Sequence, residues 1–146
     1  ASLTKSIQQD ARMRIGDDDK GGAAYHALGD LYLRFGFYDK ALKVYDNGIL
    51  NNPEAAQLYR GRGVAQLKLE RFAEAAQSFE KAIQLSPSSA TAFFNLALAQ
   101  RAQGQYKAAL DSLKRFMRQA DPSRDQIRLA AAGGLHAELV AEIEKK

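Results

Sequence analysis

The chain has 146 residues, of which 46% are hydrophobic, and its formal net charge is +4 at pH 7. A chain of this length can bury enough surface to fold as one domain, and the absence of cysteine excludes both a disulfide framework and a thiolate metal site. Lysine and arginine are scattered rather than clustered, so the charge predicts a solvated surface with some attraction for acidic partners, and no nucleic-acid partner is expected.

Residues 1–21 predict an N-terminal helix followed by a linker. An apolar side chain recurs at every fourth position from Leu3 to Ile15, which is the spacing of one face of a helix. We expect this helix to pack on the front of the next segment, as the second helix of a degenerate repeat would. The acidic run at residues 17–19 lacks the alternate-residue spacing of a calcium-binding loop, so residues 16–22 are interpreted as a solvated linker.

The central part of the chain repeats itself every 34 residues. Large aromatic residues keep this step at Tyr25, Tyr59 and Phe93, and small residues keep it at the positions Ala41, Ala75 and Ala109. Within each copy the apolar spacing is helical. The pattern predicts two helices in each copy, over residues 25–35 and 38–49, then 59–69 and 72–85, then 93–102 and 106–117.

Glycine and proline mark the ends of these helices. Gly36 and Gly104 follow a first helix, where glycine adopts left-handed backbone angles without a side-chain clash. Pro53 and Pro87 follow a second helix and disfavour its continuation. We therefore assign repeats to residues 22–55, 56–89 and 90–123. A 34-residue helical pair cannot bury its apolar face alone, so the repeats are expected to stack into a solenoid.

Residues 124–146 predict a C-terminal capping helix. Its apolar stripe consists of the residues Ile127, Ala131, Leu135, Leu139 and Ile143. Three acidic residues, Glu138, Glu142 and Glu144, are expected to keep the opposite side in water, as the end of a solenoid requires. The pair Gly133-Gly134 leaves open whether this helix is continuous or breaks there.

In its repeated positions the chain resembles the tetratricopeptide repeat (TPR) family. The first copy reads Tyr25…Leu28-Gly29…Tyr32…Tyr38…Ala41…Tyr45…Pro53, and the second reads Tyr59…Gly63…Phe72…Ala75…Phe79…Ala82…Pro87. The third copy is looser, with Ala97 in place of the glycine. The resemblance implies an all-α, right-handed solenoid over residues 1–146 with a flanking helix at each end. It also implies a non-catalytic module that binds a peptide or helix of a partner protein in a concave groove, as an adaptor or assembly factor.

The resemblance further implies which side chains line the groove, because in this family the first helix of each repeat faces it. Carried over to this chain, the groove residues are His26, Asp30, Leu33, Arg60, Val64, Leu67, Phe94, Asn95, Leu98 and Arg101. Two interpretations of Phe94 remain open. It could form a pocket flanked by Arg60 and Arg101, suited to an apolar peptide with an acidic group, or it could contact the capping helix.

One partner class of the family can be compared with these positions. Members that hold the acidic C-terminal tail of heat-shock chaperones use lysine, asparagine and arginine at set groove positions. The matching residues here are His26, Asp30, Gly61, Thr91 and Asn95. None of them is one of the expected cations, and Asp30 would repel the tail. We therefore expect chaperone acidic-tail binding to be disfavoured.

No constellation in the chain points to catalysis. His26 and His136 are the only histidines and lie far apart in the sequence, and there is no paired-histidine zinc motif, phosphate-binding loop or dinucleotide fingerprint. We expect no enzyme activity, no cofactor and no metal site. Two alternatives to the adaptor remain: a self-associating module, or a regulatory or targeting domain of a larger protein. No apolar run reaches the length of a membrane span, and the sequence does not choose between the cytoplasm and the bacterial periplasm.

Overall fold

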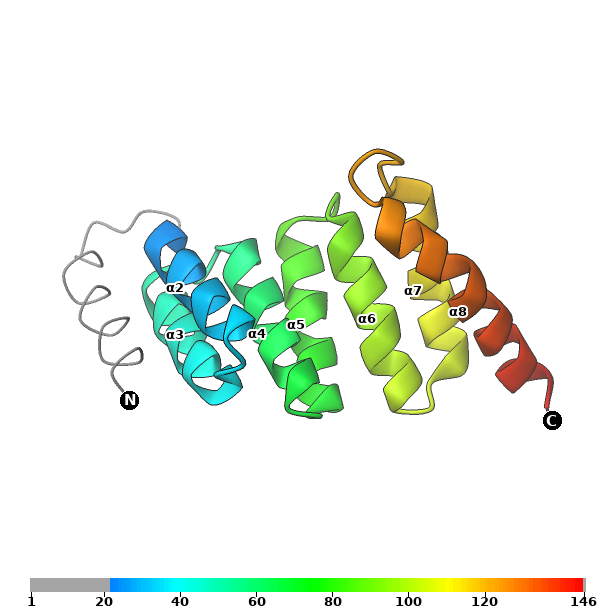
Figure 1. Cartoon of the computed structure of the whole chain (residues 1–146), viewed down its shortest axis with the longest axis horizontal. Helices are drawn as coiled ribbons and strands as arrows, with labels where there is room; N and C mark the ends of the chain where they lie inside the picture. The colour runs from blue at the N-terminus through cyan, green and yellow to red at the C-terminus, as the bar shows by residue number, and fades with distance from the viewer. Residues whose placement is uncertain (1–21, 146) are drawn as a thin grey trace.

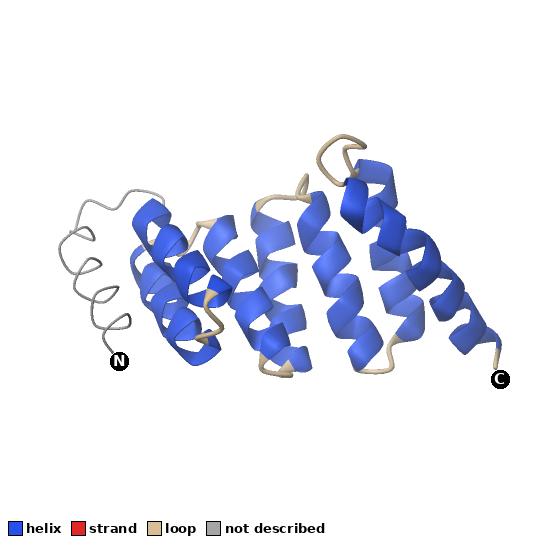
Figure 2. Ribbon diagram, in the orientation of Figure 1, coloured by secondary structure: helices blue, strands red, loops and turns tan. Residues whose placement is uncertain are grey.

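The computed structural model describes residues 22–145, so the expected N-terminal helix and acidic run lie outside the described residues. Across that part of the chain there are seven helices and no strand, arranged as a row of antiparallel helix pairs followed by a last helix (Figures 1 and 2). The helices are α2 (Ala23–Arg34), α3 (Tyr38–Asn51), α4 (Ala56–Lys68), α5 (Phe72–Leu85), α6 (Ala90–Ala102), α7 (Tyr106–Gln119) and α8 (Gln126–Glu144). The predicted all-α solenoid is confirmed.

The packing of the helices shows which side of the row is concave. Each helix packs on the next one along the chain, and α2 also contacts α4, as α4 contacts α6. Within residues 22–145, no contact of that extent joins α3 to α5 or α5 to α7. Because the helices crowd together on one side only, the row curves toward that side. The first helices, α2, α4 and α6, therefore line the inner face, and α3, α5 and α7 form the outer layer.

The same turn joins the two helices of each repeat. Gly36, Glu70 and Gly104 all have left-handed backbone angles, with φ of 78°, 60° and 75°. Beside the first of them, the Phe37 N–H donates to the Tyr32 carbonyl at 2.9 Å, and equivalent bonds recur in the other two turns. This is the Schellman arrangement that satisfies the carbonyl groups at a helix end. Glu70 holds this conformation despite its side chain, which shows that the turn geometry is imposed by the packing of the two helices.

Rings from the second helices fill gaps that glycine leaves in the first helices. A Cβ atom placed on Gly29 would lie 2.4 Å from the Tyr45 ring, and one placed on Gly63 would lie 2.6 Å from the Phe79 ring. Both rings are completely buried. Gly61 of α4 approaches Tyr45 from the other side, again with 2.4 Å between the ring and a placed Cβ. The Tyr45 ring is thus held between α2 and α4.

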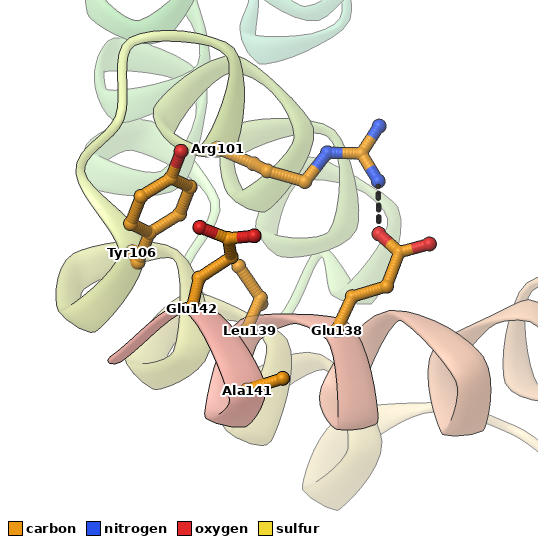
Figure 3. Close-up of a pocket in the computed structure, with 6 residues that line it drawn as sticks. All are labelled: Arg101, Tyr106, Glu138, Leu139, Ala141 and Glu142. Carbon is orange, nitrogen blue, oxygen red and sulfur yellow. Dashed lines mark hydrogen bonds and ion pairs between the residues drawn. The ribbon is translucent and has the colours of Figure 1, made fainter. Parts of the chain in front are cut away.

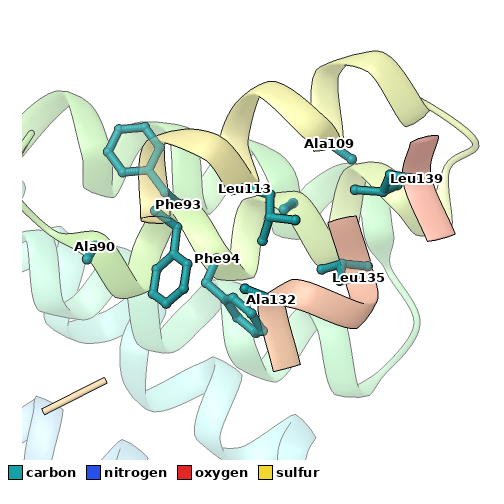
Figure 4. Packing of buried hydrophobic residues seen from close by; sticks show 10 residues of the cluster. Ala90, Phe93, Phe94, Ala109, Leu113, Ala132, Leu135 and Leu139 are labelled. Carbon is teal, nitrogen blue, oxygen red and sulfur yellow. The ribbon is translucent and has the colours of Figure 1, made fainter. Parts of the chain in front are cut away.

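Helix α8 is continuous through Gly133 and Gly134, which settles the question of a break. Its buried residues Ala132, Leu135 and Leu139 join the core of α6 and α7 (Figure 4). The predicted apolar stripe was wrong at its beginning, because Ala131 is exposed and Ile127 is 88% exposed. The reason is geometric: a turn of helix takes 3.6 residues, so a stripe of every fourth residue winds around the helix and leaves the buried face.

The gap at Gly63 can be tested against a glycine that has no neighbour. Gly63→Ala should lower the free energy of unfolding by about 1–3 kcal/mol, because the new methyl group overlaps the Phe79 ring. Gly133 also lies within a helix, but nothing lies within 4 Å of its placed Cβ. Gly133→Ala should therefore raise the free energy of unfolding, by about 0.5–1 kcal/mol. Urea denaturation of both variants measures this, and shifts of the same sign would contradict the packing described here.

Candidate functional site: the concave face

Four of the predicted groove residues give the inner face an apolar floor. They are Leu33 on α2, Val64 and Leu67 on α4, and Leu98 on α6. Each packs with one side against the buried clusters beneath it and is only partly buried. The rest of each side chain is exposed, since the helix packing uses only part of it.

A polar group lies beside this floor at the N-terminal repeat. The Tyr45 hydroxyl donates a hydrogen bond to Asp30 Oδ1 at 2.6 Å, and His26 Nε2 lies 3.4 Å from Asp30 Oδ2. Burial raises the pKa of the Tyr45 hydroxyl, and the hydrogen bond and negative charge of Asp30 raise it further. The hydroxyl therefore stays protonated and acts as a donor to a carboxylate that remains 41% exposed.

Arg60 is the cation next to this group. Its positive charge lowers the pKa of the Tyr45 hydroxyl and so offsets part of the increase caused by burial and by Asp30. Its Nη1 donates to Ser89 Oγ at 3.3 Å, and none of the ion pairs found among residues 22–145 involves it. Arg60 can therefore meet an anionic group of a ligand.

The predicted groove residue Asn95 lies on α6 and is partly buried.

The ligand-pocket interpretation of Phe94 is wrong. Phe94 is only 9% exposed, and its ring meets Phe116 of α7 edge to face, with 5.0 Å between the ring centroids. It belongs to the same buried cluster as Ala132 and Leu135 of α8, and Figure 4 shows its ring beside Ala132. The alternative interpretation, contact with the capping helix, describes its position. The adjacent Phe93 is also buried.

Arg101 also meets α8 rather than flanking a pocket with Arg60. Its Nη1 lies 3.0 Å from Glu138 Oε2, at the edge of a pocket of about 320 Å³ (Figure 3). That pocket is lined by Arg101, Tyr106, Glu138, Leu139, Ala141 and Glu142. Glu138 and Glu142 stay in contact with water, with 65% and 37% of their side chains exposed, while they line this pocket together with residues of α6 and α7.

Tyr45 is the residue of this site that the sequence analysis does not identify, because there it appears only as part of the repeat motif. The repeat itself contains a signal for it. The three equivalent second-helix positions hold Tyr45, Phe79 and Leu113, so only the first copy carries a hydroxyl. The first copy is also the only one with an acidic residue at the groove position of Asp30. A comparison of the copies, position by position, would have paired the two residues.

The described residues add two observations on other kinds of site. Between residues 22 and 145, no three histidine, aspartate or glutamate side chains are grouped so that they could hold a metal ion. No helix in the same range is long and apolar enough to cross a membrane.

Comparison with known proteins identifies relatives of the chain. A family model described as "Tetratricopeptide repeat" matches residues 26–90 and 71–125, which together make up more than half of the chain. Sperm-associated antigen 1 of Rattus norvegicus is 29% identical over 73% of this chain, but the match spans only 11% of that protein. The chain thus corresponds to a small part of this much longer relative.

Solved structures show the same fold. The TPR2B domain of yeast Sti1, in a pHsp70 complex, is 26% identical with a TM-score of 0.76, and the match covers 84% of this chain and 98% of that one. The second TPR domain of Spaghetti (RPAP3), bound to the HSP90 peptide SRMEEVD, is 24% identical with a TM-score of 0.68. That match covers 70% of this chain and 94% of the Spaghetti domain.

These structures correct one expectation about partners. Chaperone acidic-tail binding was expected to be disfavoured, because the cations used by other family members are absent at five groove positions. Structural neighbours of this chain are nevertheless domains that hold chaperone peptides, including the acidic SRMEEVD. The inference from single positions was wrong, since it treated one arrangement of cations as a requirement for the whole class of ligand.

The position of Phe94 leads to a stability prediction. Phe94→Ala should lower the free energy of unfolding by about 3–5 kcal/mol, because it removes a buried ring from the core shared by α6, α7 and α8. Phe93→Ala should have a cost of similar size, since its ring is equally buried. Thermal melting of both variants provides the measurement. If the Phe94→Ala protein melts at the same temperature as the unmodified chain, Phe94 lies in the groove and not in the core.

Proposed function

Because the chain belongs to the tetratricopeptide repeat family, whose fold is a non-catalytic protein-interaction fold, we propose that it binds a peptide or helix of a partner protein on its concave face. Its role is that of an adaptor or assembly factor. The observation that carries this proposal is the apolar floor formed by Leu33, Val64, Leu67 and Leu98, whose outer sides are not used in packing. A bound segment covers these side chains and removes apolar surface from water.

Charge supports a ligand with an acidic group. Arg60 lies on the inner helix α4 and takes part in none of the ion pairs among the described residues, and the chain has a net charge of +4. Arginine is among the residues that most often dominate the energy of an interface. Acidic peptides, chaperone tails among them, are therefore candidate ligands, and the peptide SRMEEVD held by a structural neighbour is a defined probe.

Selection from a random peptide library displayed on phage tests this proposal for any partner sequence. The intact chain should enrich peptides with apolar and acidic residues, and SRMEEVD is titrated beside them. Arg60→Glu should weaken the selected acidic peptides by about 30-fold or more, the loss typical of a central arginine. Lys43→Glu is the matched control, because it changes the net charge equally on the outer helix α3.

Two results would count against the proposal. If the library yields no enriched peptide, the concave face is not a peptide-binding site. If Arg60→Glu and Lys43→Glu weaken binding equally, the attraction comes from the net charge of the chain and not from the inner face. Fluorescence anisotropy with the selected peptides separates these cases, with circular dichroism to establish that both variants are folded.

One observation favours self-association as the second candidate. Ile127 on α8 is 88% exposed, and most of the other exposed residues of this helix are alanine or glycine. The outer side of this last helix is therefore less polar than the end of a solenoid requires. Light scattering over a range of concentrations distinguishes the two candidates, since a stable dimer supports self-association and a monomer supports the free concave face.

A further inference from the structure

The pair formed by Asp30 and Tyr45 is a departure from the repeat. Position 30 holds aspartate, whereas the equivalent positions hold Val64 and Leu98. On the second helices, the position of Tyr45 is occupied by Phe79 and Leu113, and all three of these residues are completely buried. The second and third repeats thus pack through apolar side chains alone at this point. A carboxylate and a hydroxyl are therefore not required by the fold.

The Tyr45 side chain holds this carboxylate at the inner face. Its ring passes between Gly29 of α2 and Gly61 of α4, from which a placed Cβ would be 2.4 Å away in each case. Its hydroxyl then donates to Asp30 Oδ1 at 2.6 Å, and the ring is packed on both sides and completely buried. The Asp30 carboxylate is fixed by a rigid donor while its side chain stays 41% exposed.

Asp30 retains capacity to accept further hydrogen bonds. A carboxylate has about four acceptor sites, and the Tyr45 hydroxyl occupies one of them. The second contact is weak, because His26 Nε2 lies 3.4 Å from Oδ2, beyond the usual hydrogen-bond range. The nearby guanidinium of Arg60 is directed to Ser89 instead. Among residues 22–145, only His26 lies within ion-pair distance of Asp30.

A purely structural role would not need the negative charge. Satisfying the Tyr45 hydroxyl requires one acceptor, which asparagine provides without the cost of holding a charge near apolar surface. We propose that Asp30 is a specificity-determining residue of the concave face and that it binds a cationic group of the bound segment, a lysine or arginine side chain. This inference rests on the proposed function. Tyr45 is the positioning residue, because its hydroxyl holds the Asp30 carboxylate in place.

The two charges of the inner face also set the direction in which the ligand binds. Asp30 lies on α2 and Arg60 on α4, so the inner face presents a negative charge in the first repeat and a positive charge in the second. A segment that carries a basic residue and an acidic residue on either side of apolar residues matches both charges in one direction only. The bound segment therefore runs with its basic residue toward α2 and its acidic residue toward α4.

The test uses the same displayed library on the intact chain and on three variants. The unmodified chain should enrich lysine or arginine at a fixed distance from the acidic residue of the selected peptides. Asp30→Asn keeps an acceptor for Tyr45 but removes the charge, so it should lose this enrichment and bind the selected peptides about tenfold more weakly. Asp111→Asn makes an equal charge change at an exposed position of α7. It should leave both the enrichment of basic residues and the affinity for the selected peptides unchanged.

A second comparison separates the effect of the Asp30 charge from the effect of holding that carboxylate in place. Tyr45→Phe leaves the Asp30 charge in place but removes its donor, so binding of the basic peptide should weaken less than in Asp30→Asn. Replacing the basic residue of the peptide by alanine should abolish the difference between the unmodified chain and Asp30→Asn. This double-mutant cycle isolates the contact between the two groups from general effects on folding.

The outcomes distinguish this inference from the function on which it rests. If no peptide is enriched, the proposed function fails and the inference fails with it. If peptides are enriched and depend on Arg60 but carry no basic residue, the inference alone is overturned. It is also overturned if Asp30→Asn binds basic peptides as tightly as the unmodified chain, because Asp30 would then serve only to satisfy the Tyr45 hydroxyl.

Discussion

The architecture depends on one contact, in which a ring from a second helix occupies the space that a glycine leaves on a first helix. Gly29 receives Tyr45 and Gly63 receives Phe79, and in both pairs a methyl group would overlap the ring. This contact sets how closely the two helices of a repeat approach. The contact occurs in the first two repeats, one step of 34 residues apart, and the third repeat has Ala97 and Leu113 at the same two positions.

That contact also decides which surface is free for function. The first helices pack through the side that carries Gly29, Gly63 or Ala97, so their opposite side forms the inner surface, which α8 contacts at Phe94 and Arg101. Leu33 and Val64 lie there, beside Asp30 and Arg60, and the packing of the solenoid requires neither charged residue. The inner face can thus change its side chains while the fold is kept, as the contrast between Asp30 and Val64 at equivalent positions already shows.

The sequence predicted the parts of the structure that repeat and was wrong mainly where repetition ends. The 34-residue step fixed the helices, their turns and the position of Leu33 or Val64 on a first helix. The orientation of α8 has no earlier copy to which it can be aligned, so Ile127 was expected in the core but is exposed. Phe94 and Arg101 were misassigned for the same reason, because their surroundings are completed by α8. The coupling of Tyr45 to Asp30 required the direction of a side chain, which spacing does not give.

The central claim is that the inner helices bind the ligand, and chemical-shift mapping tests it most directly. A peptide selected by the chain would be titrated into isotopically labelled protein while the backbone amide signals are recorded. We predict shifts concentrated in α2, α4 and α6 around Leu33, Val64 and Leu67, with α3, α5 and α7 unchanged on their exposed sides. Shifts confined to the outer helices, or to the exposed side of α8 around Ile127, would contradict it.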